Sequence, residues 1–149
     1  SEIKRKFEID FTIVNAENSA AGFGITPKIY EELISMGVDV VTLGNHSWDK
    51  NEIIDYMEAN PNHSIIRPLN FLNNSPGRGY KIFDHSNGKK ILVCQIHTKL
   101  FINLPLNDPF QCLDTEIISK GGTPRRSPPR PPPGRLLGAF GCLLMIPPT

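Results

Sequence analysis

The sequence predicts an α/β fold in which a mostly parallel sheet is flanked by helices. Two observations support this prediction. Short β-branched runs alternate with amphipathic helical segments, which is the pattern of parallel strands joined by crossover helices. Helix start and stop signals lie between these segments, so their boundaries do not depend on the hydrophobic pattern alone.

The first strand is expected over residues 11–14, a β-branched run typical of a buried parallel strand. Residues 19–25 form a loop with two glycines. A helix then begins with Thr26 as its N-cap and Pro27 at its first position, because both residue types favour a helix start. Apolar residues at helical spacing continue this helix until Gly37, a common helix end.

The second strand is expected over residues 38–43, directly before Gly44. Asp49 is predicted to cap the next helix, and Glu52, three residues later, would complete a capping box. This helix is expected to stop at the Asn-Pro pair of residues 60–61, since proline cannot continue a helix.

Two further features complete the predicted sheet. Residues 65–66 are a candidate third strand, and residues 80–83 and 90–96 form a hairpin with an Asn-Gly turn signal between them. In a mostly parallel sheet of this kind, the chemistry lies at the carboxyl ends of the strands.

The charge divides the chain into two parts near residue 120. Residues 1–120 hold all 15 acidic residues and 12 basic ones, a charge of about −3. Residues 121–149 hold no acidic residue, four arginines, eight prolines and five glycines. The near-neutral total therefore conceals an acidic body and a basic tail, and the boundary between these two regions is placed at residue 120.

The tail is expected to be disordered, because its prolines remove backbone donors and fix φ. Residues 121–135 should form a polyproline-like coil. One interpretation is a PxxP-type ligand around residues 130–133. The favoured interpretation is a frameshift or read-through, since arginine, proline and glycine are typical of GC-rich DNA translated in an arbitrary frame. Residues 136–146 are apolar but only 11 long, too short to cross a membrane.

The overall composition argues against several classes of protein. A net charge of +1 disfavours bulk nucleic-acid binding. No apolar run reaches the roughly 18–20 residues of a membrane span, and the first residues lack the pattern of a secretory signal. Three scattered cysteines indicate reduced thiols, which places the protein in the cytoplasm.

Polar side chains follow the first two predicted strands. Glu17 comes shortly after the first strand, and Asn45 and His46 come directly after the second. Glu17 can bridge two divalent cations, and Asn45 offers a neutral oxygen ligand. His46 could contact a phosphoryl oxygen or protonate a leaving alkoxide. Together these residue types suit two-metal hydrolysis, although Glu17 alone would usually be a surface acid and Asn45 alone a turn residue.

These segments resemble those of one protein family, in matching order over residues 7–118. The shared motifs are Asn-x-Glu-Asn, Gly-Asn-His-x-Trp-Asp-Lys, Ile-Arg-Pro-Leu-Asn-Phe, Pro-Gly-x-Gly and Leu-Asn-Asp-Pro-Phe. The family is the YmdB-like branch of the calcineurin-like metallophosphoesterases, bacterial enzymes that hydrolyse phosphodiesters, including 2′,3′-cyclic nucleotides.

The resemblance implies a layered α/β sandwich with two divalent metal ions, iron, manganese or similar. By position, it implies Glu17 as the bridging ligand and Asn45 as a ligand of the second metal. It implies His46 as the acid or phosphate-contacting histidine, and Asn18 as a neighbouring polar group at the site. Three further matches are assigned only a structural role: Arg67, Asn70 and the turn at residues 108–110.

Two parts of the family pattern are not found in this sequence. The family begins with a strand ending in Gly-Asp, and it takes three histidine ligands from segments beyond the Asp-Pro-Phe turn. Residues 1–120 are therefore expected to form a partial metallophosphoesterase sandwich that lacks the first strand and the C-terminal part. His63 and His85 are expected on the surface, and His97 is not expected to replace a missing ligand.

The sequence thus predicts a piece of a metal-dependent phosphodiesterase. The intact enzyme would act on phosphodiesters or cyclic nucleotides, and this chain would bind metal weakly or not at all and be inactive. Without the first strand, an open sheet edge should expose apolar residues, and an oligomer is compatible with the sequence. The alternative is a non-catalytic scaffold whose Pro/Arg tail binds a partner domain.

Overall fold

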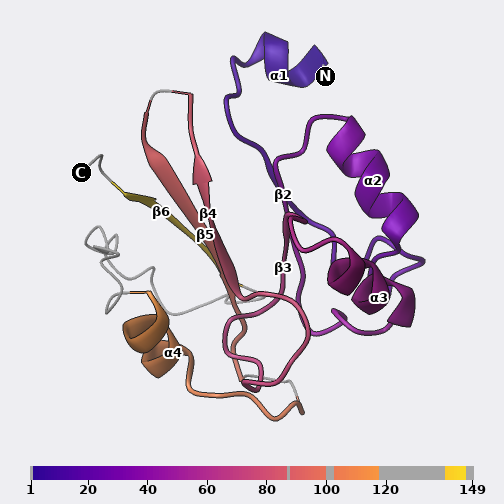
Figure 1. The fold of residues 1–149 in the computed structure, drawn as a ribbon, viewed down its shortest axis with the longest axis vertical. Helices are drawn as coiled ribbons and strands as arrows, with labels where there is room; N and C mark the ends of the chain where they lie inside the picture. The colour runs from indigo at the N-terminus through magenta and orange to yellow at the C-terminus, as the bar shows by residue number, and fades with distance from the viewer. Residues whose placement is uncertain (1, 87, 100–102, 118–139, 147–149) are drawn as a thin grey trace, which may run out of the picture.

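The computed structural model describes residues 2–86, 88–99, 103–117 and 140–146, the last of these as backbone only (Figure 1). In chain order the elements are α1 (Glu2–Lys6), β1 (Ile13–Asn15), α2 (Pro27–Ser35), β2 (Val40–Thr42), α3 (Asn51–Ala59), β3 (Ile65–Ile66), β4 (Tyr80–Asp84), β5 (Lys90–Ile96), α4 (Pro109–Glu116) and β6 (Phe140–Ile146). The predicted alternation of strands and helices is confirmed. No helix within the described ranges is long and apolar enough to cross a membrane.

The strands form two three-stranded sheets. The first is parallel with the order β1-β2-β3, and the second is antiparallel with the order β4-β5-β6. Figure 1 shows α2 and α3 beside the parallel sheet and α4 on the far side of the antiparallel one. The α/β fold with a parallel sheet and flanking helices is therefore confirmed, and the second sheet makes it a sandwich.

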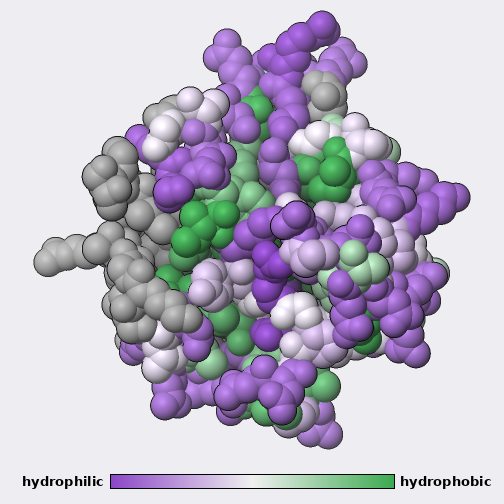
Figure 2. Space-filling model, in the orientation of Figure 1, coloured by the Kyte–Doolittle hydropathy of each residue, from purple (hydrophilic) through white to green (hydrophobic). Residues whose placement is uncertain are grey.

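Three groups of buried side chains hold these layers together. Val41 and Ile65 pack with residues of α2 and α3, whereas their neighbours Val40 and Ile66 pack with Ile91 and other residues of the second sheet. Successive strand residues face opposite sides, so β2 and β3 are buried on both faces. A third group fills the space between β5 and α4: Leu69, Tyr80, Leu92, Cys94, Leu113 and Ile117. On the face shown in Figure 2 hydrophilic residues predominate, and apolar residues emerge beside the β4 and β5 strands and near α2.

The two predicted helix caps have different outcomes. The Thr26 side chain accepts a hydrogen bond from the Ile29 amide (3.3 Å), as expected for the N-cap of α2. At α3 the prediction of an Asp49 cap with a capping box is wrong, because the N-cap is Lys50 and has no side-chain cap bond. The Asp49 carboxylate lies 2.6 Å from His46 Nδ1 instead, so this carboxylate pairs with a ring nitrogen and not with the helix amides.

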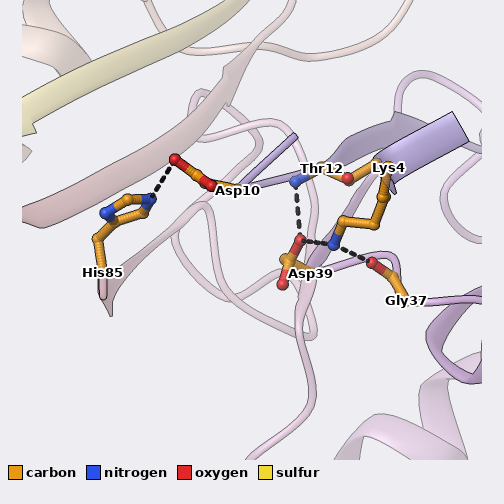
Figure 3. Close-up of polar contacts among 6 residues, drawn as sticks. All are labelled: Lys4, Asp10, Thr12, Gly37, Asp39 and His85. Atoms are coloured by element: carbon orange, nitrogen blue, oxygen red, sulfur yellow. Dashed lines mark hydrogen bonds and ion pairs between the residues drawn. The ribbon is translucent and has the colours of Figure 1, made fainter. Parts of the chain in front are cut away.

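Polar contacts attach α1 to the parallel sheet (Figure 3). The Lys4 ammonium lies 3.0 Å from Asp39 Oδ2 and donates to the Gly37 carbonyl (2.7 Å). The same Asp39 oxygen accepts a hydrogen bond from the Thr12 amide (2.7 Å). One carboxylate therefore joins α1, the approach to β1 and the turn before β2.

The predicted disorder of residues 121–149 does not hold throughout. Residues 140–146 form β6, which pairs with β5 from Lys90↔Ile146 to Ile96↔Phe140. This run contains no proline and no charge, and most of its residues are apolar. The predicted coil of residues 121–135 and the PxxP segment lie outside the described residues.

Candidate active site

The loops after β1 and β2 leave the parallel sheet at the same edge. Asn15 and Thr42 are partners in the β1–β2 register, and the Ala16 amide continues the pairing by donating to the Thr42 carbonyl (3.0 Å). The chain turns away from both strands directly afterwards. Residues 17–18 and 44–46 are therefore neighbours, as the parallel arrangement of the strands predicted.

Glu17 lies directly against Gly44. A Cβ atom built at Gly44 would coincide with the Glu17 Oε2 atom, so any side chain at this position would displace the carboxylate. The φ of Gly44 is not in the left-handed region, so the glycine is required here by space and not by a positive φ. The acidic group predicted after β1 is thus next to the residue that precedes Asn45.

The Glu17 carboxylate is incompletely satisfied. Its Oε2 atom is buried and has no hydrogen-bond partner among the described residues. The Glu17 backbone is fixed independently, because its carbonyl accepts from the Gly24 amide (2.6 Å) and its amide donates to Asn15 Oδ1 (3.3 Å). A buried carboxylate oxygen without a donor costs free energy unless a cation or a proton lies beside it. This oxygen fits a metal ligand.

Asn45 meets a residue from the second sheet. Its Oδ1 atom lies 3.4 Å from Nε2 of His97, which follows directly after β5. His97 is almost fully buried, and Asn70 fixes its backbone in both directions: the His97 amide donates to Asn70 Oδ1 (3.0 Å), and Asn70 Nδ2 donates to the His97 carbonyl (2.9 Å). Asn70 is thus a structural residue, as expected, whereas the position of His97 beside Asn45 was missed.

His46 is oriented by two neighbours. Asp49 Oδ2 lies 2.6 Å from its Nδ1 atom, and the ring of Phe23 packs edge-on against it at 5.0 Å between centroids. Nε2 of His46 has no partner within the described part of the chain, so it is available to a substrate oxygen. The sequence predicted His46 but not its carboxylate partner, because Asp49 was assigned to the helix cap.

Asn18 is exposed at the tip of the first loop. Its backbone carbonyl accepts from the Gly22 amide (3.1 Å), and no described contact joins its side chain to Glu17, Asn45 or His46. Asn18 is therefore next to Glu17 in the sequence, but the structure shows no contact of its side chain with the other predicted site residues.

The expectation that His63 and His85 are surface residues needs correction. His63 is 7% exposed, and its Nδ1 atom accepts from the Ile65 amide (3.1 Å). Burial, reinforced by the nearby charges of Arg78 and Lys81, lowers the pKa of His63 to about 4. The His85 side chain is 11% exposed and lies 4.0 Å from Asp10 (Figure 3). Neither histidine contacts the loops after β1 and β2 in the described structure.

The described residues provide few metal ligands. They contain no group of three or more His, Cys, Asp and Glu side chains arranged to hold an ion. The amide oxygen of Asn45 is an additional donor outside that set of residue types. Glu17, Asn45, His46 and His97 carry the oxygen and nitrogen atoms described above near the strand ends.

Two cavities lie around this part of the fold. A small pocket of about 170 Å³ adjoins Asn45 and is lined largely by apolar residues, among them Trp48, Phe71 and Leu106. A larger cavity of about 810 Å³ lies between β4 and α4, and none of the predicted site residues lines it. The pocket beside Asn45 is thus the one that could hold an apolar part of a ligand next to the site.

Comparisons with known proteins identify similar sequences. A family model described as YmdB-like protein matches residues 1–124. The chain is 42% identical over 127 residues to a Bacillus subtilis 2′,3′-cyclic-nucleotide 2′-phosphodiesterase, covering 85% of this chain and 46% of that protein. It is 30% identical over 124 residues to a putative phosphatase/phosphodiesterase of Mycoplasma pneumoniae, covering 80% and 43%.

Solved structures share the fold. A hypothetical protein from Thermus thermophilus matches with a TM-score of 0.67 and 36% identity, over 74% of this chain and 42% of that one. A novel phosphatase from Mycoplasma pneumoniae matches with a TM-score of 0.68 and 30% identity, over 80% and 43%. The chain therefore spans less than half the length of the relatives that it matches.

Proposed function

Because the chain belongs to the YmdB-like protein family, we propose that its two strand-end loops serve metal-dependent hydrolysis of phosphodiesters, 2′,3′-cyclic nucleotides among them. The observation that supports this proposal most directly is the Glu17 carboxylate, which has a buried and unpartnered oxygen against Gly44. The name of the B. subtilis relative supports the class of substrate.

The residues would divide the chemistry as follows. Glu17 and Asn45 would hold the metal ions, which when bound would neutralise the phosphate charge and activate a water molecule. His46 contacts a phosphoryl oxygen or protonates the leaving alkoxide through Nε2, because Asp49 engages Nδ1 and orients the ring. Asn18 adds a polar group at the rim of the site.

The chain by itself is proposed to be inactive. Metal affinity comes from several preorganised donors acting together, and the described residues offer few near the strand ends. The chain is therefore expected to bind divalent ions only weakly. A cytoplasmic location is proposed from the sequence, because three scattered cysteines indicate reduced thiols.

The test compares the 149-residue chain with a chimera in which residues 7–118 replace the corresponding segment of the B. subtilis relative. Manganese-dependent hydrolysis of 2′,3′-cyclic AMP and bis-p-nitrophenyl phosphate is measured. The chimera should turn over both substrates and the chain neither. Glu17→Gln and His46→Ala should each lower kcat by at least roughly 100-fold in the chimera.

Matched controls come from positions of the same chain that lie away from the site. Glu58→Gln, on α3, and His85→Ala remove the same chemical groups, and both variants should retain activity. A Glu17→Gln chimera as active as the parent would contradict the proposal.

A further inference from the structure

We propose that His97 is a ligand of the same cation as Asn45, with Nε2 of the imidazole and Oδ1 of the amide as its two donors. This inference rests on the proposed function insofar as the site binds a metal. It adds a residue that no motif indicated, and that comes from the second sheet of the sandwich, whereas Glu17 and Asn45 come from the first.

Both ring nitrogens of His97 face oxygen atoms. Nδ1 lies 3.1 Å from the Thr98 carbonyl oxygen, and Nε2 lies 3.4 Å from Asn45 Oδ1. A neutral imidazole has one N–H group and can donate to only one of them. Both oxygens can only accept, and the Thr98 contact is the shorter one (3.1 Å against 3.4 Å), so Nδ1–H is assigned as the donor to Thr98. The Nε2 lone pair and the Asn45 oxygen lone pairs then point at each other, which is an arrangement that a shared cation satisfies.

The distance between the two donors agrees with shared coordination. Two ligand atoms each about 2.1 Å from a tetrahedral ion lie about 3.4 Å apart. The observed separation of 3.4 Å is long for a hydrogen bond between these atoms but matches this value. The two side chains therefore already have the spacing of a coordination shell.

The surroundings hold His97 in place. His97 directly follows β5, a strand that is buried along most of its length. Two hydrogen bonds to the fully buried Asn70 fix the backbone of His97. The Thr98 contact at Nδ1 is the kind of outer contact that orients a metal-binding histidine. Near by, the unpartnered oxygen of Glu17 lies against Gly44, the residue before Asn45. An imidazole, an amide oxygen and a carboxylate together suit zinc, manganese or iron better than calcium.

The first experiment observes His97 directly in the full chain. Long-range ¹H–¹⁵N spectra report the protonation of both ring nitrogens while zinc chloride is added. Before zinc, the proton of His97 should be on Nδ1. Zinc should shift the Nε2 resonance of His97 and leave those of His63 and His85 in place. A His97 Nε2 resonance that does not move up to millimolar zinc would overturn the inference.

The second experiment measures zinc affinity by calorimetry. His97→Ala should weaken binding at least roughly tenfold, and His85→Ala should bind as the parent does. His97→Gln, which preserves a polar side chain in this buried position, serves where His97→Ala does not fold, and it should also weaken binding.

The outcomes separate this inference from the proposed function. Weaker binding in Glu17→Gln together with unchanged binding in His97→Ala and His97→Gln would overturn the role of His97 and leave the metal site intact. Unchanged binding in all three variants would contradict both. Loss of zinc affinity in the His97 variants, with the resonance shift in the parent chain, would confirm His97 as a ligand.

Discussion

At the scale of single residues, individual side-chain contacts shape the site and its surroundings, some between loops and some within one segment. Gly44 is required because the Glu17 carboxylate occupies the space of its missing side chain. Asp49 orients His46 and does not cap α3. His63, which has no role at the site, is buried against the amide of Ile65 and has its own effect on stability.

The pH dependence of stability should report the burial of His63. The pKa of His63 is about 4 in the folded protein, below the ordinary value of 6.5, so the unfolded chain binds more protons between these values. The free energy of unfolding should therefore fall as the pH falls from 6.5 towards 4. Urea denaturation at neutral pH, at a pH between 6.5 and 4, and at a pH near 4 measures this change in the free energy of unfolding.

The matched variants are His63→Gln and His85→Gln. A glutamine oxygen at residue 63 can accept from the Ile65 amide without titrating, so part of the loss of stability at low pH should disappear. The His85→Gln variant should show the same loss of stability at low pH as the parent chain. An undiminished loss in His63→Gln would show that burial of this histidine is not its cause.

At the scale of secondary-structure elements, the two helices of the first layer begin in different ways. α2 has a threonine cap with a hydrogen bond, and α3 has none. Both helices nevertheless pack against the parallel sheet through buried side chains. Packing thus stabilises α3 without a side-chain cap, in agreement with the general dominance of tertiary contacts in helix stability.

The difference between the caps predicts different costs for two substitutions. Thr26→Ala removes a cap hydrogen bond and should lower the free energy of unfolding by about 1 kcal/mol. Asp49→Ala removes only a partly exposed pair with His46 and should cost less, about 0–0.5 kcal/mol. Urea denaturation monitored by circular dichroism measures both. A larger cost for Asp49→Ala than for Thr26→Ala would indicate that Asp49 supports the helix after all.

At the scale of the whole molecule, two sheets pack face to face and bring distant segments together. Val40 and Ile66 from the parallel sheet contact Ile91 and Val93 from the antiparallel one. This packing places the end of β5 beside the end of β2, so that His97 meets Asn45. Within the parallel sheet, β1 lies on the side of β2 away from β3. It pairs with no other strand in the described ranges and therefore forms an edge of the sheet.

The edge at β1 should promote self-association. Ile13 on this strand is 37% exposed, and an uncovered strand with an apolar side chain is a template for pairing with another copy. Ile13→Lys should reduce self-association, because edge lysines oppose strand pairing. Sedimentation velocity at several concentrations measures it.

Ile34→Lys is the matched control for the edge. Ile34 is also 37% exposed but lies on α2, away from the edge. Its substitution should leave self-association unchanged. An equal reduction in both variants would show that general surface charge, and not the strand edge, is responsible.

The sequence was sufficient for features that depend on neighbouring residues. The β-branched runs identified β1, β2 and β3, the Asn-Gly signal identified the β4–β5 hairpin, and the Thr26-Pro27 pair identified the start of α2. It also predicted that the loops after β1 and β2 would meet, because parallel strands end at a common edge. These features arise from backbone preferences and residue spacing, which a short segment contains in full.

Packing between distant segments decided the rest. Nothing near His97 in the sequence indicates Asn45, 52 residues earlier, because their contact requires two sheets to face each other. The pairing of β6 with β5 likewise depends on which groups the fold brings within reach. Such contacts have no local period or motif, since their energy comes from burial and hydrogen bonds formed only once the chain is compact.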